Sequence, residues 1–172
     1  SATGCNERAR NYMIELQEKI TLVSGLSSDI PIEKRPRVAL LEWLDPLFDG
    51  GHWSPEIIEF AGGDPCFGEY RRPSRRREWN ELIKAEPDII FVALCGFDIT
   101  RSQKDVDIFT ASPHFRQMAR NKELRVFLVD GNAYFSRPGP RLVDALQIMA
   151  NALHPDHHRL PSGIPAALEI EI

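Results

Sequence analysis

The chain has 172 residues, of which 42% are hydrophobic and 27% charged, and its formal net charge is −4. This composition is typical of one ordinary globular domain, and it argues against a disordered chain or a nucleic-acid-binding protein. The longest apolar stretches span about seven residues, far below the roughly 20 needed to cross a bilayer. We therefore expect no membrane segment, and the first ten residues lack the apolar core of a signal peptide.

The first predicted element is a long helix. Apolar residues recur there at spacings of four, three, four and three, which places them on one helical face. They are Ala9, Met13, Leu16, Ile20 and Val23. Gly25 is expected to end this helix, so that residues 1–25 form an N-terminal helical segment and residues 26–36 form a linker.

Three later segments are continuous apolar runs of strand length, at 37–43, 88–94 and 125–129. Runs without alternation are typical of parallel strands that are covered on both faces. Helical signals follow each run, so the chain alternates between strand and helix. The sequence therefore predicts an α/β fold with a mostly parallel sheet and right-handed crossovers, formed by residues 37–155.

Caps and prolines mark two helices between the first two strands. Ser54 is a candidate N-cap, Pro55 suits the first helical position, and a Gly-Gly pair ends that helix. Ser74 is a candidate cap for the next helix, and Pro87 prevents its continuation.

The remaining helices are expected after the second and third strands. Segments 101–109 and 112–119 predict two short helices, and a last helix is expected from Pro140 to a stop at Pro155. Residues 156–172 form an irregular tail, whose final residues could pair as an edge strand or hang free.

The loops that follow the three predicted strands share a character. Each combines aromatic rings with a few polar groups. They are WLDPLFDGGHW (43–53), CGFD (95–98) and GNAYFSRPGP (131–140). The carboxyl ends of parallel strands meet at one edge of a sheet, which is where open α/β sheets bind ligands. The sequence therefore predicts a small-molecule site at this edge.

Three segments carry a family resemblance. They are RVALLEWLDPLFDGGHWSPEIIEFAGG, PDIIFVALCGFD and VDGNAYFSRPGPRLVDALQIMANALHP. Over about residues 5–155, the chain resembles the C-terminal lobe of the cobalamin-binding branch of the iron-chelate and vitamin B12 periplasmic binding proteins. The resemblance implies a Rossmann-like three-layer sandwich, which is a single lobe of the class III periplasmic-binding-protein fold. Residues 5–25 would match the end of the helix that bridges the two lobes of that family.

The resemblance also implies a function. In that family a corrinoid or a siderophore lies between two lobes, and the loaded protein docks on an ABC permease. We therefore expect noncovalent binding of cobalamin or a related corrinoid, with no required cofactor and an extracytoplasmic location. Motifs for hydrolases, zinc proteases and phosphate loops are absent from the sequence, so we expect no catalysis. The N-terminal lobe is absent from this sequence, so the chain is either a fragment of a longer precursor or a natural single lobe.

Aromatic and polar residues of the three loops are candidate ligand contacts. Flat rings can cover the broad face of a corrinoid, and a few polar groups can anchor it. The candidates are Trp43, Asp45, Phe48, His52, Trp53, Phe97, Asp98, Asn132, Tyr134, Phe135 and Arg137. The rings could equally cap the hydrophobic core, and only one of the adjacent Tyr134 and Phe135 need face a cleft.

Two of these candidates have a chemical alternative. His52 could coordinate cobalt, although a lone histidine is more often a hydrogen-bonding or surface group. By the resemblance, Arg137 matches an arginine near the family's cleft, where a guanidinium could meet the phosphate of a corrinoid nucleotide loop. The structural alternative is an ion pair of Arg137 with Asp130 or Asp144.

Cysteines and a histidine cluster give weaker signals. Cys95 could coordinate a metal, but a single cysteine after a buried strand is usually an inert small hydrophobe. A disulfide between Cys66 and Cys95 stays open, because the sequence does not show their separation. His154, His157 and His158 could trap a metal ion or belong to a surface tail.

An arginine-rich run occupies residues 71–77 and could bind phosphate. The resemblance places it beside the cleft and at the start of a surface helix, where an acidic residue contacts permease arginines in the family. Glu78 and Glu81 are the candidates for this docking role. The family pattern has consecutive acidic positions, whereas here Asn80 precedes Glu81.

Two other functions fit the sequence. The aromatic loops could form the interface of a single-lobe interaction or dimerisation module without a transport role. Alternatively, the arginine run would suit an anionic iron-siderophore.

Overall fold

The computed structural model describes residues 4–120 and 123–172, so residues 1–3 of the predicted helical segment 1–25 lie outside the described residues. The three predicted strands are present as β1 (Arg37–Leu44), β4 (Ile89–Val92) and β5 (Arg125–Leu128). They pair side by side in the order β1-β4-β5, and both pairings are parallel. The prediction of an α/β fold built on parallel strands is confirmed.

Three short strands complete the sheet. β2 (Leu47–Asp49) folds back antiparallel on the end of β1, and β3 (Asp64–Phe67) pairs in parallel with the start of β1. β6 (Leu168–Ile170) pairs antiparallel with β5, so the chain's final residues form an edge strand. The sheet is therefore mixed and mostly parallel.

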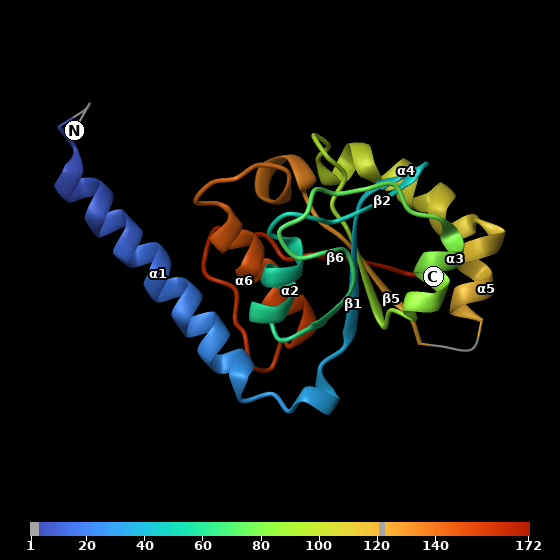
Figure 1. Ribbon diagram of the computed structural model, residues 1–172, viewed down its shortest axis with the longest axis horizontal. Helices are drawn as coiled ribbons and strands as arrows, with labels where there is room; N and C mark the ends of the chain where they lie inside the picture. The colour runs from blue at the N-terminus through green and yellow to red at the C-terminus, as the bar shows by residue number, and fades with distance from the viewer. Residues whose placement is uncertain (1–3, 121–122) are drawn as a thin grey trace.

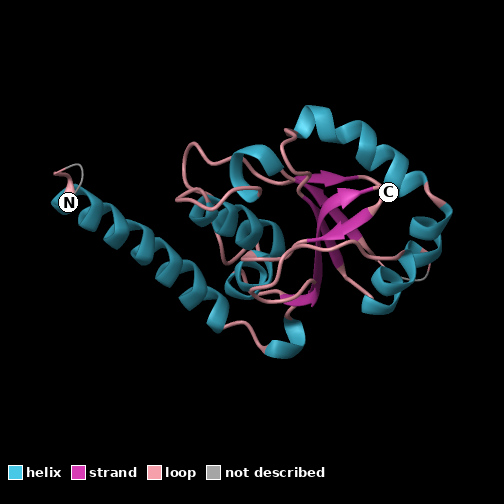
Figure 2. Ribbon diagram, turned by 45° about the horizontal axis from the view of Figure 1, so that its top comes forward, coloured by secondary structure: helices cyan, strands magenta, loops and turns pink. Residues whose placement is uncertain are grey.

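Helices cover both faces of this sheet, which gives the three layers seen in Figures 1 and 2. One face carries α1 (Asn6–Ser28), α2 (Ser54–Phe60) and α6 (Leu142–Leu153). The other face carries α3 (Trp79–Ala85), α4 (Ile99–Ala111) and α5 (Pro113–Ala119). Two single turns, η1 (Ile32–Lys34) and η2 (Gly131–Phe135), lie before β1 and after β5.

The alternation of side chains along β1 explains why both faces are covered. Val38 and Leu40 belong to the core under α2 and α6, whereas Ala39 and Leu41 belong to the core under α4 and α5. All four are buried, because successive side chains of a strand point to opposite faces. An uninterrupted apolar run is therefore what a central strand of this sheet requires.

Several predicted helix ends are wrong. α1 continues through Gly25 to Ser28, because its last turns are held against the body by the buried Val23 and Ser27. α3 begins at Trp79 rather than near Ser74, because Glu78 and Glu81 form a reciprocal capping box. α2 already includes Ser54, and the last helix begins at Leu142 rather than Pro140.

The first half of α1 projects away from the body, whereas its second half lies against α2 and α6 (Figure 1). Tyr12, Met13 and Ile14 on the projecting part are 48%, 64% and 50% exposed, so about half or more of each side chain is uncovered. Over residues 4–120 and 123–172, no helix combines the length and the apolar character that a membrane crossing requires.

Candidate functional site

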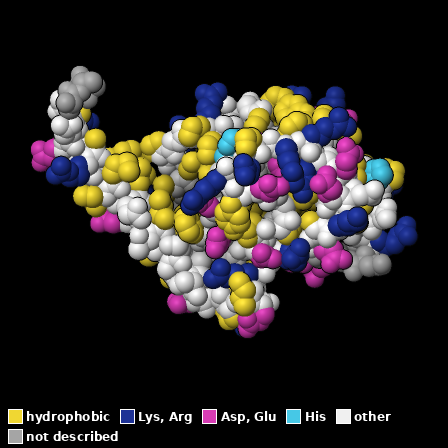
Figure 3. All heavy atoms as spheres, viewed as in Figure 1, with side chains coloured by type: hydrophobic (Ala, Val, Ile, Leu, Met, Phe, Trp, Pro, Cys, Tyr) yellow, Lys and Arg dark blue, Asp and Glu magenta, His cyan; other side chains and the backbone are white. Residues whose placement is uncertain are grey.

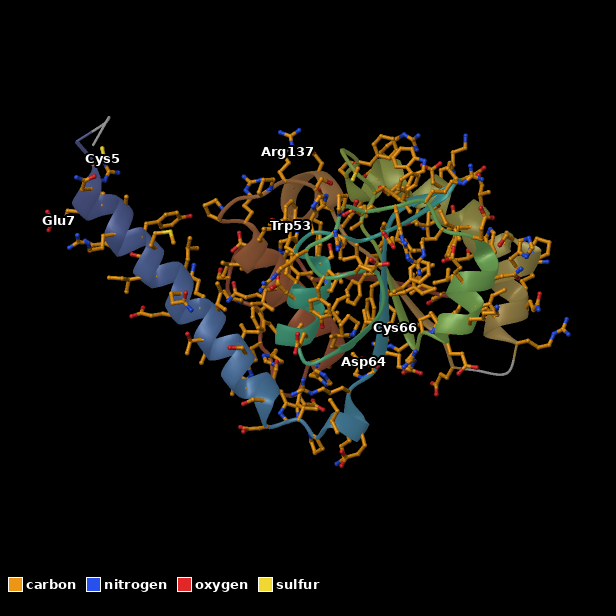
Figure 4. All side chains as sticks on the ribbon, viewed as in Figure 1. Cys5, Glu7, Trp53, Asp64, Cys66 and Arg137 are labelled. Atoms are coloured by element: carbon orange, nitrogen blue, oxygen red, sulfur yellow. The ribbon has the colours of Figure 1, made fainter. Side chains whose placement is uncertain are left out.

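The three aromatic loops meet at the carboxyl edge of the sheet, which we define as the ends of β1, β4 and β5. The amide of Asn132 donates to the carbonyl of Phe97 at 3.1 Å, which joins the third loop to the second. The indole N–H of Trp53 donates to the carbonyl of Phe135 at 3.3 Å, which joins the first loop to the third. Figure 4 shows Trp53 and Arg137 at the same end of the molecule. The predicted convergence is confirmed.

The candidate rings divide between the two faces of the sheet. Trp53 and Tyr134 pack on the core under α2 and α6. On the other face, the rings of Trp43 and Phe97 lie 5.3 Å apart, and Phe97 packs on the core under α4. Phe135 is only 4% exposed, so its ring belongs to the core and is not a cleft contact. The carboxyl edge thus has an aromatic group on each side.

Phe48 and His52 lie in the first loop, on either side of its turn into α2. Phe48 is half-buried in β2, where it pairs with Trp43 across the strands. His52 is exposed and takes a left-handed conformation (φ 54°), which its backbone hydrogen bonds to Arg72 and Arg71 maintain. Its ring lies 5.4 Å from the ring of Trp53. Both side chains therefore extend the aromatic groups already described.

The polar candidates are exposed, but their hydrogen bonds differ. Asp98 is the N-cap of α4 and accepts from the amide of Arg101 at 2.8 Å. The backbone carbonyl of Asp45 accepts from the indole of Trp43 at 3.0 Å, and the residue is exposed. Asn132 is exposed on the first turn of η2. These groups remain able to accept or donate further hydrogen bonds.

Arg137 is exposed and, among the described residues, has no ion pair with Asp130 or Asp144. Asp130 instead caps η2 by accepting from the amide of Ala133 at 2.7 Å. The structural alternative for Arg137 is therefore wrong, and its guanidinium is available at the carboxyl edge.

Four polar side chains that the sequence did not predict as a group are linked by hydrogen bonds at the carboxyl edge: Glu42, Ser74, Cys95 and Ser136, which we call the polar notch. The Cys95 thiol lies 3.8 Å from the Glu42 carboxylate, and Ser74 hydrogen-bonds to that carboxylate. The amide of Gly96 donates to the Ser136 hydroxyl at 3.4 Å. One signal was present in the sequence, since Glu42 is the only acidic residue of the apolar run 37–43.

Burial disfavours the charged forms of both Glu42 and Cys95. Desolvation raises the pKa of Glu42, although hydrogen bonding from Ser74 and the proximity of His52 oppose the shift. Desolvation and then the Glu42 charge raise the pKa of Cys95, so its thiol is neutral at neutral pH. A neutral thiol is a poor metal ligand, which favours the inert interpretation of Cys95.

No disulfide joins Cys66 and Cys95, and both cysteines are free. Cys66 lies in β3 beside the start of β1, whereas the amide of Cys95 bonds to the carbonyl of Glu42 near the end of β1. Three residues of β1 separate these positions, roughly 10 Å at about 3.3 Å per residue, which exceeds the reach of a disulfide.

The arginine run of residues 71–77 is largely engaged with carboxylates. Arg77 is only 13% exposed in its side chain and pairs with Asp49 and Glu81, each at 3.1 Å. The other pairs are Arg71–Glu56, Arg75–Glu69, Arg75–Asp49 and Arg76–Glu78. These contacts hold the loop before α3 against β2. The arginine run therefore mainly stabilises the fold, and few of its guanidinium groups are left to bind phosphate.

Glu78 and Glu81, the docking candidates, lie at the start of α3. Glu81 accepts from the amide of Glu78 at 2.8 Å and pairs with Arg77, whereas Glu78 faces Arg76 at 3.7 Å. Both side chains are exposed, so a partner could reach them.

The histidines of the tail are not a loose surface cluster. His158 is 4% exposed, and its ring lies 3.1 Å from the hydroxyl of Ser27 in α1. The ring of His154 hydrogen-bonds to the carbonyl of Gly62 at 3.0 Å. Within the part of the chain that the structure describes, no group of three or more potential ligands is arranged to hold a metal ion.

The surface beside Trp43 is hollowed. A cavity of about 420 Å³ opens there on the α3 and α4 side, and Asp45, Trp79 and Arg101 also line it. Figure 3 shows hydrophobic and basic side chains next to each other along the upper rim of the body. The carboxyl edge therefore offers concave, partly apolar surface with charged groups at its border.

Comparisons with solved structures agree on the fold. The chain superposes on a periplasmic binding protein from Veillonella parvula with a TM-score of 0.71 and 22% identity, covering 88% of this chain and 52% of that one. A periplasmic heme-binding protein from Pseudomonas aeruginosa gives 0.61 and 17%, covering 91% and 55%. An ABC-type Fe³⁺-hydroxamate transport protein from Saccharomonospora viridis gives 0.59 and 17%, covering 87% and 49%.

The chain thus has the fold of a single lobe of the class III periplasmic binding proteins, and it spans about half the length of these similar structures. No family model matches the chain, and no curated protein matches its sequence.

Proposed function

We propose that this chain is one lobe of an extracytoplasmic substrate-binding protein that holds a corrinoid noncovalently for uptake by an ABC permease. The observation that carries the proposal is the convergence of three loops at the carboxyl edge, with aromatic rings on both faces of the sheet and polar groups on the same loops. Such an edge is where open α/β sheets bind ligands. No bond is made or broken in this function, and no cofactor is required.

The geometry suits a broad, flat and partly apolar ligand. Trp53 and Tyr134 on one side and Trp43 and Phe97 on the other offer rings that could contact such a face with little loss of side-chain entropy. Arg137 is exposed nearby and could pair with the phosphate of a nucleotide loop. The solved neighbours described as binding heme or Fe³⁺-hydroxamate support a metal chelate as the ligand class.

An anionic iron-siderophore is the weaker alternative. The sequence basis for it was the arginine run, but most of those guanidinium groups already pair with carboxylates of the same chain. The cationic surface that would attract an anionic chelate is therefore largely neutralised.

Permease docking is assigned to Glu78 and Glu81, which are exposed at the start of α3. An exposed carboxylate there can meet an arginine of a partner without losing the capping box, because each carboxylate has several acceptor sites.

The proposal is tested by titrating the chain with cyanocobalamin, followed by calorimetry and by visible absorption. A single wall buries less of a ligand than two walls, so we expect weak binding, with Kd on the order of 0.1–1 mM. Trp53→Ala and Trp43→Ala should each weaken binding about tenfold, as expected for aromatic anchors. Tyr12→Ala on the projecting part of α1 is the control and should have no effect.

Two results would reject this function. One is the absence of heat and of a spectral shift at millimolar cyanocobalamin. The other is a stable dimer in light scattering that ignores ligand and dissociates on Trp53→Ala, which would support the interaction-module alternative.

A further inference from the structure

The polar notch contains a carboxylate that the fold does not neutralise. Glu42 and Asp49 are the two acidic residues of the β1–β2 hairpin with restricted solvent access, which makes them a matched pair. Asp49 is 2% exposed in its side chain and pairs with Arg77 at 3.1 Å and with Arg75 at 3.9 Å. Glu42 has no ion pair with Lys or Arg among residues 4–120 and 123–172.

The groups that hydrogen-bond to Glu42 are neutral, and the two charged groups that act on it, His52 and Asp49, have opposing effects on its pKa. Ser74 accepts from the amide of Gly51 at 3.0 Å, which leaves its hydroxyl proton for Glu42. The Cys95 thiol lies 3.8 Å from the Glu42 carboxylate, in the loop that follows β4, and the Ser136 hydroxyl hydrogen-bonds to the same thiol. A partly buried carboxylate is stabilised by donors, and here the protein supplies weak ones.

A ligand group that enters the notch therefore meets a negative charge with unused acceptor capacity. A primary amide can donate its N–H groups to the lone pairs of Glu42 that the protein leaves unused. A carboxylate in the same place would face a like charge at short range without an intervening cation, which is unfavourable in a partly dry site.

We propose that the polar notch is a subsite for an uncharged amide of the ligand, and that Glu42 excludes ligands with a carboxylate at that position. This inference rests on the proposed function and deepens it, because it selects amide-bearing corrinoids against haem and carboxylate-bearing chelates. Glu42 thus acts as a specificity-determining residue rather than as a source of overall affinity.

The test compares two probes that differ by one group. Cyanocobalamin carries amide side chains, and its mild acid hydrolysis gives monocarboxylic derivatives of almost the same size. Each is titrated at pH 7 against the wild-type chain, Glu42→Gln, and Glu15→Gln as the control. Glu15 lies on the exposed part of α1, so that variant makes the same change in charge far from the notch.

We expect the wild-type chain and Glu15→Gln to prefer cyanocobalamin over at least one monocarboxylic isomer by about tenfold. In Glu42→Gln this ratio should fall below about threefold, chiefly through stronger binding of the acid derivative. Circular dichroism establishes that the variant is folded, and the near-isosteric change removes a charge that burial disfavours.

Different results would contradict the proposed corrinoid binding and the proposed role of Glu42. If the wild-type chain binds none of these corrinoids, both the proposed function and the inference are wrong. If it binds them without preference, or if the preference persists in Glu42→Gln, the inference alone is wrong.

Discussion

The charged groups at the two edges of the sheet differ in their ion pairing. We define the amino edge as the starts of β1, β4 and β5, opposite the carboxyl edge. At the amino edge, Arg37 pairs with Asp64 at 3.3 Å and also donates to the carbonyl of Ala85. At the carboxyl edge, Glu42 and Arg137 form no ion pair among the described residues. These amino-edge groups therefore pair within the fold, whereas Glu42 and Arg137 at the carboxyl edge remain without an ion pair, as the proposed ligand site requires.

Loop length explains part of this difference. The return from α3 to β4 at the amino edge takes only residues 86–88, whereas the carboxyl-edge connection from β5 to α6 takes residues 129–141. A longer connection on a rigid scaffold can present aromatic rings and polar groups that are not buried in the core. The longer connection is consistent with the proposed site at the carboxyl edge.

The largest expected effect comes from breaking the contact between two loops of the carboxyl edge. A Cβ at Gly131 would collide with the carbonyl oxygen of Leu94 and lie 2.8 Å from the carbonyl carbon of Ala93. Because backbone cannot move aside as a side chain can, Gly131→Ala should lower the free energy of unfolding by about 3 kcal/mol. Urea denaturation followed by circular dichroism measures this loss.

Gly139→Ala is the matched control, because its Cβ would meet nothing within 4 Å. It should change the free energy of unfolding by less than about 0.5 kcal/mol. Equal stability of the two variants would contradict the close approach of the second and third loops.

A smaller effect on the free energy of unfolding is expected from the buried His158. Burial and the neighbouring His154 and His157 lower the pKa of His158. A histidine with a lowered folded pKa stabilises the fold while it is neutral, and that contribution is lost as the pH falls below the unfolded pKa. His158→Gln should cost about 1 kcal/mol at pH 7.5, because the contact with Ser27 is altered.

The decisive measurement is the change in unfolding free energy between pH 7.5 and pH 5. The wild-type chain should lose more stability over this range than His158→Gln, since the variant has no proton to bind at this position. His114→Gln, at an exposed position in α5 on the other face of the sheet, serves as the control and should follow the wild type. Parallel losses in the wild type and His158→Gln would show that His158 does not titrate with unfolding.

Much of the fold was predictable because its central strands are long apolar runs. A continuous run such as 88–94 needs cover on both faces, and that requirement alone leads to a parallel sheet between helices. The cap of α5 was also predictable, since Ser112 accepts from the amide of Phe115 at 3.2 Å. By contrast, β3 contains a proline, which argues against a strand in the sequence, and yet it pairs in parallel with the start of β1.

The site was predicted less completely than the fold. Loop composition located the carboxyl edge, but it could not divide Trp53 and Trp43 between the two faces, which depends on tertiary packing. Glu42 was overlooked because the run was interpreted as uniformly apolar. A charged residue in a buried strand costs stability, so an acidic residue within an apolar run is a candidate functional residue on sequence grounds alone.

The smallest expected effect concerns an exposed contact at the amino edge. Arg125 donates to both carboxylate oxygens of Glu169, at 2.6 and 3.0 Å, and this contact lowers the pKa of Glu169. Both side chains are substantially exposed, so a double-mutant cycle with Arg125→Ala and Glu169→Ala should give a coupling of only about 0.5 kcal/mol.

The coupling between Arg125 and Glu169 should fade in two ways. It should weaken in 1 M salt, because exposed charges are screened. It should also be lost as the pH falls through the range in which Glu169 is protonated, since a lowered folded pKa stabilises only above that range. Arg125→Ala should cost more than Glu169→Ala, because the guanidinium also lies 4.7 Å from the ring centroid of Phe127. A coupling that is insensitive to both salt and pH would mean that the contact between Arg125 and Glu169 does not act as an ion pair. The pairing of β5 with β6 would then depend on its other contacts.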